Sequence, residues 1–254
     1  MDLKGAVAVV TGGNGGLGQR ICHKLAEAGA DIAVVCARSM ADAEKVAGEV
    51  VRGPGGNAIR AKAFACDVAD PAAVRRLVDD VTAHLGRIDI LVNDAAYNIS
   101  IPFPDLDRLT LEEWQKIMAI NLTGPMLLTK AVGPVMKRQG RGGIVNVGSL
   151  AGCVGMPFQG LYCASKYALE GLTEALRLEV APFGVSVALV APGDTATTVV
   201  ENRIRAGASA DPASAYRPAF AATLARYEAD ERAGAPAAAV AARIAAIVEG
   251  RARA

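Results

Sequence analysis

Residues 6–25 read AVAVVTGGNGGLGQRICHKL: small and β-branched apolar residues, a turn with five glycines, and an amphipathic segment. The first part, Ala6–Val10, is typical of a buried strand, while Leu17, Ile21 and Leu25 recur at helical spacing. Glycines between them permit positive φ and let a phosphate approach the backbone, and the N-terminus of the following helix offers unpaired N–H groups. A glycine-rich stretch alone is compatible with a simple turn, but the strand–turn–helix context predicts a site for the pyrophosphate of a dinucleotide.

The rest of the chain alternates short apolar runs with helical segments. We expect further strands at 32–36, up to 67, at 88–92, 144–147 and 185–190, and helices at 41–51, 111–137, 162–181 and 236–249. This alternation predicts an α/β fold, a Rossmann-type doubly wound parallel sheet with strand order 3-2-1-4-5-6. Ligands of such folds bind at the carboxyl edge of the strands.

A single domain, 1–254, is expected because no repeat or interior linker divides the chain. The Ala- and Arg-rich segment 194–235 is interpreted as a substrate-side lid or as peripheral helices. The net charge of +1, with acids and bases mixed, gives no case for nucleic acid or an anionic membrane as partner. Five scattered cysteines without a CxxC pair argue against a metal site and, with no signal segment, favour a cytoplasmic protein.

The end of the second expected strand indicates which dinucleotide binds. An NAD site usually carries Asp or Glu there for the ribose 2′-hydroxyl, whereas this chain has Ala37-Arg38-Ser39 and no acid before Asp42. A guanidinium at Arg38 can pair with a 2′-phosphate in bidentate fashion, and the Ser39 hydroxyl adds a donor. We therefore expect NADP(H), the alternative being that Arg38 is a solvated surface residue.

Tyr162 and Lys166 lie four residues apart at the start of an expected helix, so the phenol and the ammonium share one face. A free phenol has a pKa of about 10, and a nearby ammonium lowers that pKa. Ser149 follows the strand at 144–147 and therefore lies at the carboxyl edge of the sheet. A chance surface pair would explain Tyr162 and Lys166 alone, but the position of Ser149 favours general acid–base chemistry.

In order and spacing, these motifs resemble the short-chain dehydrogenase/reductase family over most of residues 1–198. Asn121, Ser149, Tyr162 and Lys166 resemble its catalytic tetrad. With the glycine turn, the resemblance implies a cofactor site made of Gly12, Asn14, Gly16, Leu17, Gly18, Arg38, Ser39, Asp67, Val68, Asn93, Ala95, Pro192, Gly193, Thr195 and Thr197, beside Tyr162 and Lys166.

The same resemblance implies the roles of the tetrad. Tyr162 exchanges a proton with the carbonyl oxygen, and Ser149 donates a hydrogen bond to that oxygen. Lys166 lowers the pKa of the tyrosine and binds the nicotinamide ribose, while Asn121 holds a water of a proton relay. The family pattern also implies a homodimer or homotetramer.

Three departures from the family pattern stand out. Asp94 and Ala96 occupy places where the family usually has Asn and Gly. Gly15 stands where some NADP-specific members have a basic residue, so phosphate recognition leans on Arg38, Ser39 and Asn14. The C-terminus lacks the family's closing strand, which makes a seventh strand doubtful.

Tyr97, Cys153 and Phe158 are expected to line the substrate site with Ser149 and Tyr162. The mostly apolar stretch 154–161 favours a ketone or secondary alcohol with a hydrophobic body. For four arginines of the 194–235 segment the sequence leaves two interpretations, attraction of an acidic substrate group or, more simply, a solvated helix face: Arg203, Arg205, Arg217 and Arg226.

The sequence thus predicts an NADP(H)-dependent oxidoreductase that interconverts a ketone and a secondary alcohol, with Tyr162 as general acid and base. An epimerase-like enzyme that uses NADP transiently is the first alternative. A non-catalytic dinucleotide sensor is the second, although it would not require all four tetrad residues. A serine hydrolase is poorly supported, because residues 147–151 read VGSLA rather than GxSxG.

Overall fold

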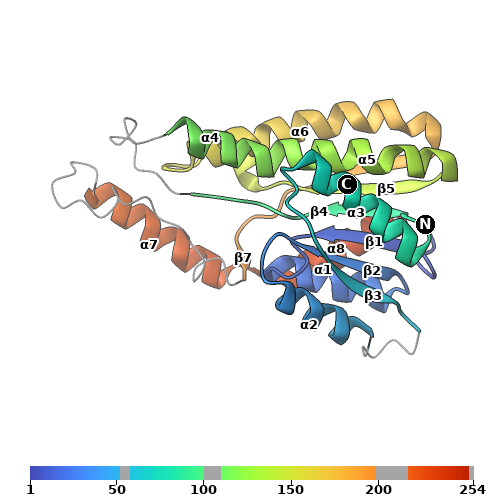
Figure 1. The fold of residues 1–254 in the computed structure, drawn as a ribbon. Helices are drawn as coiled ribbons and strands as arrows, with labels where there is room; N and C mark the ends of the chain where they lie inside the picture. The colour runs from blue at the N-terminus through green and yellow to red at the C-terminus, as the bar shows by residue number, and fades with distance from the viewer. Residues whose placement is uncertain (52–57, 100–109, 198–216, 252–254) are drawn as a thin grey trace.

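The computed structural model describes residues 1–51, 58–99, 110–197 and 217–251 and contains a six-stranded parallel sheet (Figure 1). Its strand order is β3-β2-β1-β4-β5-β6, which confirms the predicted topology. The strands are β1 (Val7–Thr11), β2 (Asp31–Cys36), β3 (Ala61–Ala65), β4 (Ile90–Asn93), β5 (Gly142–Val147) and β6 (Val185–Val190). The order reverses between β1 and β4, which is where doubly wound sheets open a crevice for ligands.

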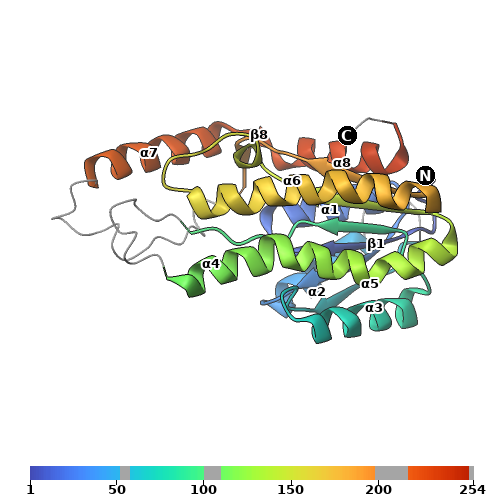
Figure 2. The ribbon, with the colours of Figure 1, turned by 90° about the horizontal axis from the view of Figure 1, so that it is seen from above.

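Helices cover both faces of the sheet (Figures 1 and 2). One layer contains α1 (Gly16–Glu27), α2 (Met40–Val51) and α8 (Ala237–Glu249), and the other contains α3 (Pro71–Leu85), α5 (Gly124–Gln139) and α6 (Gly160–Val180). Alternate residues of each strand serve the two layers: in β1, Ala8 and Val10 belong to the first core and Val7 and Val9 to the second. Burial on both faces explains why the strands are apolar throughout.

The helix expected at 111–137 is interrupted. It consists of α4 (Leu111–Met118), a π-helical turn over Ala119–Thr123, and α5. Pro125, in the first turn of α5, has no backbone N–H to give to the preceding turn, and the side chain of Asn121 is buried within the irregular turn. Such π turns often occur at functional sites because they reorient one side chain.

The 194–235 segment forms an excursion from the sheet. Two short strands, β7 (Thr195–Ala196) and β8 (Ala235–Pro236), pair with each other, and α7 (Arg217–Ala233) precedes β8 and extends away from the main body (Figure 1). Of the arginines considered above, Arg203 and Arg205 lie outside the described residues. Within the described residues, no seventh strand joins the main sheet.

The described helices include none that is both long and apolar enough to cross a membrane. Nor do the described ranges bring together three or more His, Cys, Asp or Glu side chains in a way that could hold a metal ion.

Candidate active site

The glycine turn after β1 requires glycine for steric reasons at two positions. Gly12 has φ +66°, and a Cβ there would lie 3.1 Å from the backbone N and Cα of Ala95. A Cβ at Gly18 would overlap the carbonyl oxygen of Gly12. The turn therefore packs backbone against backbone at the start of α1, and the N-terminus of a helix after such a turn is a place where a phosphate can bind.

Arg38 and Ser39 lie next to this turn, at the end of β2. Both are exposed, and the side-chain amide of Asn14 donates a hydrogen bond to the carbonyl oxygen of Arg38 (3.2 Å). Ser39 has φ +56°, and its carbonyl oxygen accepts the N–H groups of Asp42 and Ala43 at the start of α2. The structure thus brings the Arg38–Ser39 pair to the edge of the glycine turn.

Other residues expected at the cofactor have clear structural partners. Asp67 is exposed and accepts the N–H of Ala69 (2.9 Å), while Val68 is buried and packs at Gly124. Asn93 is buried and donates to Asn146 on the neighbouring strand (2.8 Å). The N–H of Ala95 donates to Thr11 Oγ1 (3.1 Å), which ties the loop after β4 to the end of β1.

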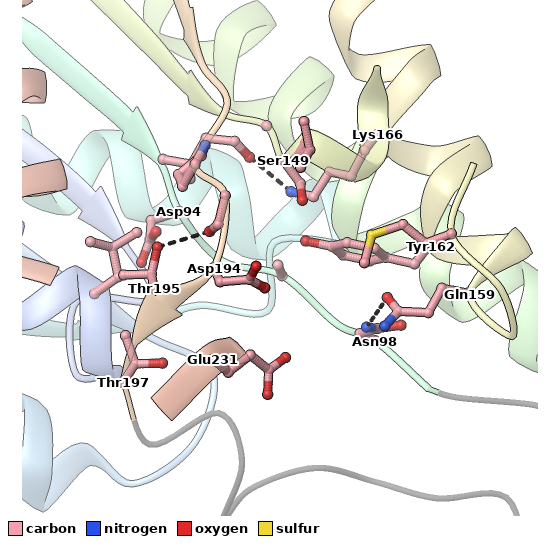
Figure 3. A pocket seen from close by; sticks show the side chains of 18 of the residues that line it. Asp94, Asn98, Ser149, Gln159, Tyr162, Lys166, Asp194, Thr195, Thr197 and Glu231 are labelled. Atoms are coloured by element: carbon pink, nitrogen blue, oxygen red, sulfur yellow. Dashed lines mark hydrogen bonds between the residues drawn. The ribbon is translucent and has the colours of Figure 1, made fainter. Parts of the chain in front are cut away.

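A cavity of about 450 Å³ opens at the carboxyl edge of the sheet. The loops after β4, β5 and β6 line it, together with α1, α6 and α7. Expected site residues in its wall are Leu17, Tyr97, Ser149, Tyr162, Lys166, Pro192, Gly193, Thr195 and Thr197. Figure 3 shows Tyr162 and Ser149 facing the loop that carries Asp194 and Thr195 across this space.

Ser149 and Tyr162 lie beside each other in the cavity wall. Burial raises the pKa of the Tyr162 phenol, and the nearby Ser149 hydroxyl opposes that rise. Both oxygens face the cavity, so a carbonyl oxygen placed there meets two hydroxyl donors. This arrangement can protonate and stabilise a developing alkoxide.

Lys166 differs from expectation. Its Nζ donates to the carbonyl oxygen of Val147 (2.8 Å) and lies 5.6 Å from the centroid of the Tyr162 ring. Burial lowers the pKa of Lys166 to about 8, and the carboxylate of Asp94 opposes this change. In this arrangement burial is the main influence on the pKa of Tyr162 and raises it above its ordinary value.

Asp94 is the unexpected charged group of the site. Burial raises its pKa to about 7, while Lys166 lowers it, and a Cβ at Gly18 would lie 2.9 Å from its Oδ2. The sequence marks Asp94 only as a departure from a family pattern. That its carboxyl group shares a cavity with Lys166 follows from strand order, which brings the ends of β1, β4 and β5 together.

Asn121 does not line the cavity but supports its wall. Its side chain accepts the N–H of Tyr97 (2.8 Å) and donates to the Tyr97 carbonyl oxygen (2.9 Å) and to Ser165 Oγ (3.0 Å). The π turn directs this amide between the loop after β4 and helix α6. Asn121 therefore fixes the loop whose residues Tyr97 and Asn98 face the cavity.

Two expected substrate residues lie elsewhere. Cys153 is exposed with its Sγ 3.8 Å from Glu170, and Phe158 packs edge-on against Phe220 of α7 at a ring-centroid distance of 5.2 Å. Of the stretch 154–161, expected to form an apolar wall, Met156 and Gln159 line the cavity. Three further polar residues line it as well: Asn98, Asp194 and Glu231.

Comparisons with known proteins agree with this geometry. A model of the short chain dehydrogenase family matches residues 6–207. A 3-oxoacyl-[acyl-carrier-protein] reductase of Synechocystis sp. is 37% identical over 225 residues, covering 89% of this chain and 84% of its own. A D-threitol dehydrogenase of Mycolicibacterium smegmatis is 40% identical over 190 residues, covering 75% of this chain and 70% of its own.

Solved structures show the same architecture with either dinucleotide. A metagenomic short-chain oxidoreductase in complex with NADP is 36% identical with a TM-score of 0.70, over 76% of this chain and 84% of that one. An NAD⁺-bound xylitol dehydrogenase is 29% identical with a TM-score of 0.81, over 98% of this chain and 94% of that one.

Proposed function

Because the chain belongs to the short-chain dehydrogenase family, an oxidoreductase family whose members bind a nicotinamide dinucleotide, we propose that it interconverts a ketone and a secondary alcohol with NADP(H). The observation that carries this proposal is that the hydroxyl groups of Ser149 and Tyr162 face one cavity at the carboxyl edge of the sheet. A bound nicotinamide supplies or receives the hydride.

The chain's own groups manage the proton. In reduction, the Tyr162 hydroxyl donates its proton to the substrate oxygen, and the Ser149 hydroxyl stabilises the charge that develops there. In oxidation, the phenolate of Tyr162 takes that proton back. Lys166, held on the Val147 carbonyl oxygen, is the nearby cation that favours the phenolate once the proton has left.

The glycine turn and the Arg38–Ser39 pair support the choice of NADP(H). Close backbone packing at Gly12 and Gly18 leaves room for a pyrophosphate, and Asn14 links the turn to Arg38. No carboxylate stands at the end of β2 to accept a ribose 2′-hydroxyl, because residues 37–39 are Ala, Arg and Ser. An exposed guanidinium there suits a 2′-phosphate.

The test is the Tyr162→Phe variant. We expect this variant to bind NADPH as the wild type does, which the fluorescence of the bound cofactor measures. Its kcat with the best ketone of a panel should be lower by about 10²-fold or more. Ser149→Ala serves as a parallel variant, since it removes the second donor. Unchanged turnover by Tyr162→Phe would refute the proposal, and substrate conversion without net NADPH oxidation would favour an epimerase instead.

A further inference from the structure

The side of the cavity nearest α7 is lined by four polar side chains: Asn98, Gln159, Asp194 and Glu231. They come from the loop after β4, the start of α6, the loop after β6 and helix α7. Figure 3 shows all four on the side of Tyr162 away from Lys166, with the Glu231 carboxyl group directed into the open space. We call this set the polar wall.

The polar wall is rich in hydrogen-bond acceptors. The Asn98 amide donates to Gln159 Oε1 (3.1 Å), and its own Oδ1 is buried with no hydrogen-bond partner in the described part of the chain. The carboxyl groups of Asp194 and Glu231 add acceptors. Because a buried polar atom without a partner is unfavourable, a ligand that brings donors to this wall is favoured over one that does not.

Acidic side chains outnumber basic ones among the described residues of the cavity lining, with Asp94, Asp194 and Glu231 beside Lys166. The Lys166 ammonium donates to the Val147 carbonyl oxygen. Besides burial, which is the main cause, the charges of Asp94 and Glu231 raise the pKa of Tyr162. A lining of this composition opposes an anionic substrate.

The helix that carries Glu231 is fixed against the rest of the site. The Tyr227 hydroxyl donates to the Pro157 carbonyl oxygen (3.1 Å), and Phe220 packs on Phe158. Both contacts are made with the loop that leads into α6 and Tyr162. Phe158 thus holds α7 in place, and Glu231 has a defined position relative to the reacting hydroxyl.

Building on the proposed oxidoreductase function, we propose that the polar wall recognises hydroxyl groups next to the reacting carbon. The substrate class is then a neutral polyol or its hydroxyketone, and carboxylates, phosphates and acyl thioesters are disfavoured. A hydroxyl group donates to an acceptor of the wall and still accepts from the Gln159 amide, so it satisfies both kinds of partner. A site built around such bonds discriminates strongly against analogues that lack the hydroxyl.

Four-carbon alcohols provide a matched test with NADP⁺: secondary butanol, butanetetrol, β-hydroxybutyrate and an aminobutanol. We expect kcat/KM for butanetetrol to exceed that for secondary butanol by about 10-fold or more, with β-hydroxybutyrate the poorest. In Glu231→Leu, the ratio of butanetetrol to butanol should fall about 10-fold. Glu231→Gln, which keeps an acceptor without charge, should retain most of the ratio and improve β-hydroxybutyrate.

Asp230→Ala is the matched control, because Asp230 neighbours Glu231 on α7, pairs with Arg226 and lies outside the cavity lining. Its ratio should equal that of the wild type. A wild-type preference for butanol, β-hydroxybutyrate or aminobutanol overturns the inference, as does an unchanged ratio in Glu231→Leu. If butanol is oxidised through Tyr162 while butanetetrol is not, this inference alone fails; if no alcohol is oxidised, both proposals fail.

Discussion

Replacing Asp94 by Asn removes the buried carboxyl group at the carboxyl edge of the sheet while keeping its shape. Burial raises the pKa of Asp94 from 3.8 to about 7, with Lys166 opposing the rise. A folded state that holds this proton above the unfolded pKa loses stability as pH rises between these two values, since it must give the proton up. The free energy of unfolding of the wild type should therefore fall between these two pH values, and that of Asp94→Asn should not fall for this reason.

The size of this cost follows from the shift. Between the two pKa values, each pH unit lowers the free energy of unfolding of the wild type by about 1.4 kcal/mol. Near pH 7 the carboxyl group is half-titrated, so the change there is smaller. Asp94→Asn should therefore become more stable relative to the wild type by about 2 kcal/mol between pH 5 and pH 7. Lys166, with its pKa near 8, remains mostly charged over this range.

Urea unfolding at pH 5, 6 and 7 measures the difference directly, because the titration of groups that do not interact with Asp94 cancels between wild type and variant. Asp79→Asn is the control, since this exposed residue of α3 faces water, and its profile should run parallel to that of the wild type. Parallel profiles for Asp94→Asn as well would refute the assignment of a shifted carboxyl group at this position.

Two further substitutions test the cofactor site. Arg38→Glu should weaken NADP(H) binding by about 10- to 100-fold, the loss expected for charged hydrogen bonds. It should strengthen NAD(H) binding, since a carboxylate accepts a hydrogen bond from the ribose 2′-hydroxyl. The KM values for both dinucleotides measure this change of preference, and an unchanged preference would place Arg38 outside the site. Gly18→Ala should lower the free energy of unfolding by about 1–3 kcal/mol and weaken cofactor binding, because its Cβ meets the Gly12 carbonyl oxygen. Gly133→Ala on α5, where a Cβ meets nothing within 4 Å, should do neither. Thermal unfolding of both variants with and without NADPH measures the loss of stability and the loss of cofactor binding.

The sheet could be predicted because four of its strands, β1, β2, β4 and β5, are buried along their whole length and therefore appear as mostly apolar runs. The glycine turn and the positions of Ser149 and Tyr162 could also be predicted, since each follows directly from a place along a strand or a helix. The residues on the substrate side of the cavity could not be predicted. Cys153 and Phe158 are close to Tyr162 in sequence, but the chain turns between Gly152 and Gly160 and points Phe158 at α7 instead of the cavity.

Asp94 and Glu231 also could not be assigned to the site from the sequence. They lie far apart in the sequence, one after β4 and one on α7, and only the three-dimensional arrangement brings both charges to bear on Tyr162. Charges that act through a shared cavity leave no periodic pattern in the sequence. Such groups become visible only when strand order and the path of α7 are known.

The pairing of β7 with β8 has a consequence for how this protein can change. Thr195 pairs with Ala235, and the Ala235 N–H donates to the Asp194 carbonyl oxygen (2.9 Å), so the chain leaves the sheet and returns to it at the same point. The described helix between these strands, α7, is joined to the rest of the fold through this one pairing. Substitutions on α7 can therefore change the side chains that line the cavity, such as Glu231, while the strand order of the main sheet stays the same.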